Sequence, residues 1–194
     1  MASQSFAQLV SLACHDLRTP LATASGFART LERLDKLGHP ADRYVEMIGA
    51  ATDQLSELLD LLSVAARIEA DRFEPRLRRT NTRELADAAA ARIEDGRASV
   101  EGDGVEVRAD PDWGATSLSA LAEAARRHGG LESITITAAG ATIAIAPIVD
   151  DAGAIALGDD LRDFAAAVGA RVLQTGGAML ELAGDRLHVH FPQL

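Results

Sequence analysis

The residue of this chain best suited to chemistry is His15, within the segment 14–21, Cys-His-Asp-Leu-Arg-Thr-Pro-Leu. A neutral imidazole is a good nucleophile near pH 7, and a phosphorylated histidine passes its phosphoryl group on readily. Thr19 lies one helical turn further along on the same face. The alternative is a solvated side chain without a role, which is what a lone exposed histidine on a helix usually is.

The apolar pattern around His15 predicts a helix over residues 3–36 whose histidine points away from its buried seam. Apolar residues recur there at alternating steps of three and four, as in a packed helical bundle. They are Phe6, Val10, Ala13, Leu17, Ala24, Phe27, Leu31 and Leu34. With Val10 and Leu17 at position a of the heptad, His15 falls at position f, furthest from the seam. Pro20 lacks an N–H, so we expect it to kink or loosen this helix.

A second amphipathic helix is predicted over residues 41–70, after a break at residues 37–40, Leu-Gly-His-Pro. Two long helices joined by a short turn form an antiparallel hairpin. Neither helix can cover its apolar stripe with the other alone, whereas two copies of the hairpin can, as a four-helix bundle. We therefore expect a homodimer.

The segment 15–21, His-Asp-Leu-Arg-Thr-Pro-Leu, followed by Gly26, Phe27 and Leu31, resembles the phosphoacceptor box of two-component sensor histidine kinases. The resemblance implies that His15 carries the phosphoryl group and that Asp16 assists its proton transfer. It also implies that Thr19 orients a hydrolytic water. Arg18 contacts phosphate or the acidic site of a partner, or is simply solvated. The alternatives for Asp16 and Thr19 are a solvated acid and a helix residue that bonds back to a carbonyl.

The rest of the chain predicts an α+β sandwich, with helices on one face of a mostly antiparallel sheet. The domains are expected at 1–72, the helical hairpin, and 80–194, joined by a charged link over 71–82 with Pro75. Helices are expected at 82–93, from 110–112 to 128, and at 159–168. Strands are expected at 105–109, 133–138, 142–148, 170–174, 179–182 and 186–191. A loop or short hairpin is expected at 94–104, and a hairpin turn at Gly176-Gly177. This layout resembles the ATP-binding domain of histidine kinases.

The residues that this resemblance requires for nucleotide binding are largely missing. The family holds its metal with an Asn in a pattern like Asn-Ala-x-x-His, and here the Asn position is Ala124. Asn81 is the only asparagine of the chain, so no shift of alignment restores the motif. Of the Asp-x-Gly-x-Gly segment that binds adenine, only Asp151 and Gly153 remain, and these are short enough to be an ordinary loop. About five residues separate Gly153 from the next predicted helix, too few for a phosphate-covering lid.

Composition indicates a cytoplasmic protein. No apolar run approaches the roughly 20 residues of a membrane span, and the start has no signal-peptide pattern. A single cysteine, Cys14, excludes an internal disulfide. The formal net charge of −10 argues against binding nucleic acid or anionic lipid through a broad surface.

The sequence therefore favours a histidine phosphotransferase of a bacterial phosphorelay, which exchanges phosphoryl groups between His15 and the aspartates of response-regulator receiver domains. Mg²⁺ would come from the receiver, and no tightly bound cofactor and no ATP are expected. One alternative is a divergent sensor histidine kinase that phosphorylates His15 with ATP. Another is a pseudo-kinase adaptor without catalysis, which the intact His15 disfavours.

Overall fold

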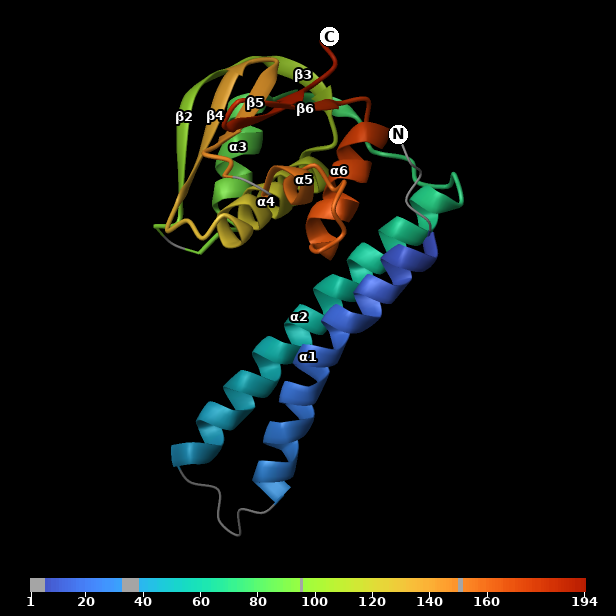
Figure 1. The fold of residues 1–194 in the computed structure, drawn as a ribbon, viewed down its shortest axis with the longest axis vertical. Coiled ribbons are helices and arrows are strands. Elements are labelled where there is room, and N and C mark those ends of the chain that lie inside the picture. Colours follow the sequence, from blue (N-terminus) through green and yellow to red (C-terminus); the bar gives the residue numbers. More distant parts are fainter. Residues whose placement is uncertain (1–5, 33–38, 95, 150–151) are drawn as a thin grey trace. The chain divides into compact units, whose positions relative to one another are not determined.

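The computed structural model describes residues 6–32, 39–94, 96–149 and 152–194, and it divides the chain into two compact units. The first unit, Met1–Ala66, is a pair of long helices; the second, Arg67–Leu194, combines helices and strands (Figure 1). None of the helices that the structure describes is both long enough and apolar enough to cross a membrane.

Helix α1 covers Phe6–Glu32 and α2 covers His39–Glu69, and the two form the antiparallel hairpin that the sequence predicts (Figure 1). The last three residues of α2 already belong to the second unit. The predicted ends at residues 3–5 and 33–36 lie outside the described residues. Helix α1 runs through Pro20, whose side chain is buried. The Phe27 and Tyr44 rings stack with their centroids 5.5 Å apart, which ties the two helices together. The buried seam is aliphatic and includes Leu9, Ala13, Ala51, Val64 and Ala65.

The second unit is a five-stranded sheet with helices on one face, as the sequence predicts (Figure 1). Its strands lie in the order β2-β4-β5-β7-β6, and only the β2–β4 pair is parallel. The strands are β2 (Ala98–Gly104), β4 (Ile134–Gly140), β5 (Thr142–Ala146), β6 (Met179–Ala183) and β7 (Arg186–His190); β1 (Arg78–Asn81) pairs separately with β3 (Glu106–Ala109). The helices are α3 (Thr82–Ala90), α4 (Pro111–His128), α5 (Ala152–Ala156) and α6 (Phe164–Thr175).

An aliphatic core between the sheet and the helices holds this unit together. Buried isoleucines from β4 and β5 face buried leucines from α3 and α4. Asn81, Asp110 and Asp163 cap the amino ends of α3, α4 and α6 by accepting hydrogen bonds from backbone N–H groups. Each such cap satisfies donors that the helix itself leaves open, and contributes about 1 kcal/mol.

The predictions for residues 71–104 were wrong at two places, because both segments are polar strands. Residues 98–104, predicted as a loop or hairpin, form β2, an edge strand whose Glu101 and Asp103 are exposed. Residues 78–81, predicted as part of the link, form β1. In β2 only Ala98 and Val100 pack against the core, so the alternation of apolar and polar residues is too short to mark a strand, and β1 has none.

The predictions for residues 152–177 were wrong for the opposite reason, because residues 164–173 are almost uniformly apolar. The helix expected at 159–168 and the strand expected at 170–174 are replaced by one helix, α6, and residues 152–156 form the short α5. Gly176 and Gly177 follow the end of α6 and do not form a hairpin turn between strands. A segment buried on most sides shows neither periodicity clearly, and it is the Asp163 cap that marks where α6 begins.

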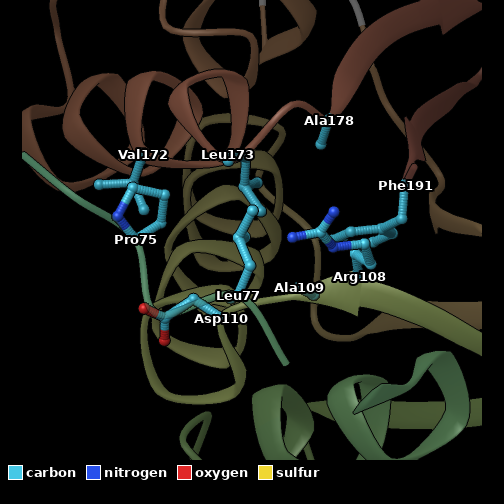
Figure 2. Close-up of a pocket in the computed structure, with 11 residues that line it drawn as sticks. Pro75, Leu77, Arg108, Ala109, Asp110, Val172, Leu173, Ala178 and Phe191 are labelled. Carbon is cyan, nitrogen blue, oxygen red and sulfur yellow. The ribbon is translucent and has the colours of Figure 1, made fainter. Parts of the chain in front are cut away.

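A small apolar cavity lies where the carboxyl half of α6 faces α4 and β3 (Figure 2). Leu77, Val172, Leu173 and Phe191 line much of it, and its volume is about 20 Å³. That is room for about one water molecule. This cavity, which is partly open to solvent, is therefore too small for a nucleotide.

Candidate functional site

Helix α1 presents His15 to solvent, with 75% of its side chain exposed. Leu9 and Ala13 of the same helix are fully buried against the hairpin, so the helix is anchored by the face opposite His15. An exposed imidazole on a packed helix is accessible to a second protein while its backbone stays fixed. That is what a group-transfer residue needs, because transfer depends above all on positioning.

The carboxylate of Asp16 lies beside the His15 ring, with Asp16 Oδ1 3.2 Å from His15 Nδ1. Helical spacing does not predict this contact, since neighbouring residues point about 100° apart. Both side chains are sufficiently exposed to turn toward each other; Asp16 is 33% exposed. Within the described part of the chain, Asp16 is the only hydrogen-bond partner of the ring. With Nδ1–H donating to Asp16, the lone pair of Nε2 faces outward as the nucleophile.

Arg18 and Thr19, the other two residues singled out on this helix, are both exposed. The backbone carbonyl of Thr19 accepts a hydrogen bond from Thr23 Oγ1 at 3.0 Å. The Thr19 hydroxyl itself has no hydrogen-bond partner among the residues that the structure describes. It is thus not occupied by a bond back to a carbonyl, which was the alternative role for this side chain.

On α4, the position at which the resemblance places the metal-binding Asn is buried. Ala124 has 0% exposure and offers only a methyl group. Its neighbours in the motif bond to protein groups: Arg126 Nη2 donates to Glu123 Oε1 at 2.6 Å, and this bond holds the pKa of Arg126 above its ordinary value. Arg127 Nη2 donates to Asp163 Oδ2 at 2.7 Å. This stretch therefore supplies helix-packing and ion-pair contacts, and no metal ligand at position 124.

Asp163 ties the end of α4 to the start of α6 and was not singled out in the sequence. Its carboxylate, only 5% exposed, accepts hydrogen bonds from Ala166 N and Arg127 Nη2, and lies 3.3 Å from His128 Nε2. An acid followed by Phe-Ala-Ala-Ala is a helix-start pattern, so the cap, though not the ion pairs, could have been predicted.

Of the remnant of the adenine-binding segment, Asp151 lies outside the described residues and Gly153 within them. Gly153 is buried in α5, and a Cβ added there would lie 2.6 Å from Leu182 Cδ2. The glycine thus packs against the side chain of Leu182 on β6. A second glycine makes a close contact between α6 and α4. Gly169 of α6 packs against Ser117 of α4, and a Cβ added at Gly169 would lie 3.2 Å from Ser117 Cα.

Comparison with known proteins identifies the first unit. Residues 7–71 match the family described as "His Kinase A (phospho-acceptor) domain". No curated protein sequence matches the chain. Among solved structures, the fold is similar to a histidine kinase of Acinetobacter baumannii, AdeS, at 14% identity, with a TM-score of 0.67 over 92% of this chain and 98% of that one.

Two further structures share the fold. Full-length ShkA, solved in complex with AMPPNP, has 19% identity and a TM-score of 0.55, over 97% of this chain but only 45% of that one. A bacterial phosphotransferase has 15% identity and a TM-score of 0.51, over 97% of each chain. Residues 7–71 thus match the phospho-acceptor domain of histidine kinases, and the α+β unit that follows shares its fold with the histidine kinase structure.

Proposed function

We propose that this protein is a histidine phosphotransferase of a two-component phosphorelay, which accepts and donates phosphoryl groups on His15. The observation that carries the proposal is the exposed His15 ring, held at Nδ1 by Asp16 and open at Nε2, within a phospho-acceptor domain. The donors and acceptors are the aspartates of response-regulator receiver domains.

The proposed step needs only the side chains of α1 and the partner. His15 Nε2 attacks the phosphorus of the receiver's aspartyl phosphate. An N–P bond forms, the O–P bond breaks, and the aspartate leaves as a carboxylate. Asp16 stabilises the positive charge that develops on the ring by accepting the Nδ1–H hydrogen bond. Arg18, exposed beside His15, neutralises phosphate or acidic charge of the partner, and Mg²⁺ comes with the receiver.

Nucleotide chemistry does not fit the second unit, and we propose that this unit does not use ATP. The metal-ligand position is the buried methyl of Ala124, and the nearby cation Arg127 is paired with Asp163 and Glu123. We propose instead that the α+β unit serves as a scaffold or docking surface for the receiver.

We further propose that the functional form is a homodimer. Large apolar side chains of the hairpin remain exposed in one chain, among them Leu21 on α1 and Val45 and Leu59, which share one face of α2. A second hairpin that packs against them would complete a four-helix bundle. Sedimentation velocity of the full chain tests this, and a monomer at micromolar concentration would contradict it.

The test of the proposed function is transfer from a receiver domain labelled on its aspartate, in the presence of Mg²⁺. We expect acid-labile label on the wild-type chain and none on His15→Gln. His128→Gln is the matched control, since it removes an imidazole that also lies beside an aspartate. If neither the wild-type chain nor His15→Gln takes up label from any of several receivers of the same organism, the proposal is contradicted. The non-catalytic adaptor would then be the remaining function.

A divergent histidine kinase is the second candidate, and the fold favours it, since the likeness to AdeS covers both units. Incubation with γ-labelled ATP and Mg²⁺ separates the two candidates. We expect no label on the wild-type chain. Label on the wild type that is lost in His15→Gln would establish the kinase instead.

A further inference from the structure

The face of the five-stranded sheet that carries no helices presents two histidines of β7, His188 and His190. Successive residues of a strand point to opposite faces, so these two share one face while Leu187 and Val189 are buried beneath the helices. Their rings are nearly parallel, at 9°, with centroids 5.9 Å apart. Both side chains are half-buried, so solvent reaches them.

The surroundings prepare one of these rings for binding a cation. His190 Nδ1 lies 2.9 Å from Thr142 Oγ1 on β5; in the tautomer that carries its proton on Nδ1, the threonine oxygen accepts the hydrogen bond. The lone pair of Nε2 is then free, and this is the arrangement found for metal-binding imidazoles, whose other nitrogen is hydrogen-bonded. Glu181 Oε2 on β6 lies 3.8 Å from His190 Nε2 and adds negative charge there.

The strand register places the remaining neighbours. Glu181 and Ala144 flank His188, whereas Met179 and Thr142 flank His190. Alanine at 144 leaves the His188 ring without a bulky neighbour on β5, so the ring can turn toward His190. The exposed thioether of Met179 lies on the same face and is a further soft donor.

We propose that His188 and His190 chelate one divalent transition-metal ion, of the Zn²⁺, Ni²⁺ or Cu²⁺ type. Imidazole nitrogens prefer these ions to Mg²⁺ or Ca²⁺. No group of three or more His, Cys, Asp or Glu side chains within the described residues encloses an ion position. The ion is therefore held by two imidazoles and completed by water, with Glu181 as a neighbouring charge and Thr142 as a positioning residue. This site is independent of the function proposed for His15.

Calorimetric titration of the untagged full chain with ZnCl₂ tests the proposal. We expect one ion per chain, binding that is weakened at least about tenfold in His188→Gln and His190→Gln, and no binding in the double variant. Thr142→Val should weaken binding by about tenfold, because the Nδ1 hydrogen bond is lost. His15→Gln is the control and should bind like the wild type.

Two outcomes would overturn the proposal: a wild-type chain that takes up no Zn²⁺, or a double variant that binds as tightly as the wild type. Circular dichroism checks that the variants are folded. Should the double variant fail to fold, electron paramagnetic resonance of the wild-type chain with one equivalent of Cu²⁺ decides. Coupling to two imidazole nitrogens would support the chelate, and coupling to one or none would contradict it.

Discussion

The part of the chain that the structure describes contains two histidine–aspartate pairs of nearly equal length and very different surroundings. His15 Nδ1 lies 3.2 Å from Asp16 Oδ1 on α1, and His128 Nε2 lies 3.3 Å from Asp163 Oδ2 between α4 and α6. The His15 ring is 75% exposed and its acid 33%, whereas the values for His128 and Asp163 are 28% and 5%.

The comparison teaches that a distance alone does not identify a reactive histidine. Asp163 also bonds Arg127 and caps α6, so its charge is committed to holding two helices together. Asp16 has no such second role among the described residues, and the other nitrogen of its histidine is open. We infer that the first pair does chemistry and the second provides stability.

The largest effect is expected from removing the imidazole of the exposed pair. His15→Ala should reduce phosphoryl transfer from a labelled receiver to background, because it removes the nucleophile that is proposed to form the N–P bond. His128→Ala should retain transfer. Equal loss in both variants, with both folded, would break the distinction between the pairs.

Asp16→Asn should slow phosphoryl acceptance by about 10²-fold, since the carboxylate no longer stabilises charge on the His15 ring. Rapid-quench kinetics with a phosphorylated receiver measures this. Unfolding should be unaffected, because Asp16 is a partly exposed side chain outside the core. A variant that accepts phosphate as fast as the wild type would show that Asp16 is only a solvated acid.

Asp163→Ala should leave transfer rates intact but lower the free energy of unfolding of the second unit by about 2–4 kcal/mol. The variant loses a helix cap and charge-assisted hydrogen bonds. The loss of free energy of unfolding stays modest because Arg127 is half-exposed and solvent screens its charge. Urea unfolding followed by the fluorescence of Trp113, the single tryptophan and a residue of α4, isolates this unit. Asp163→Asn, which can still cap, should lose less than half as much.

The smallest effect is expected at Thr19, one turn beyond His15. Thr19→Ala should change stability by less than about 0.5 kcal/mol, because its hydroxyl has no partner within the described chain. It should lengthen the lifetime of phosphohistidine if the hydroxyl orients water, without changing the transfer rate. Thr23→Ala is the matched control, as its hydroxyl already donates to Thr19 O.

Much of the fold could be predicted because the periodicity of apolar residues indicates the buried face of a long amphipathic helix or an alternating strand. The helices at 82–90 and 111–128 carry Asn and Asp caps and one apolar face, and the strands at 134–140, 179–183 and 186–190 are bounded by turns. Segments β1 and β2 were missed because a polar edge strand is defined by its pairing partner. Helix α6 was misread because burial on most sides hides the helical period.

The sequence by itself determined the helical hairpin, the outward position of His15 and the loss of the asparagine at position 124, because periodicity and residue chemistry are local properties. Only the tertiary structure decided that Asp163 reaches Arg127 and His128 from 36 and 35 residues away. It alone also decided that Glu181 and Thr142 flank the histidines of β7. Such contacts depend on strand register and helix packing, which bring together residues that the sequence keeps apart.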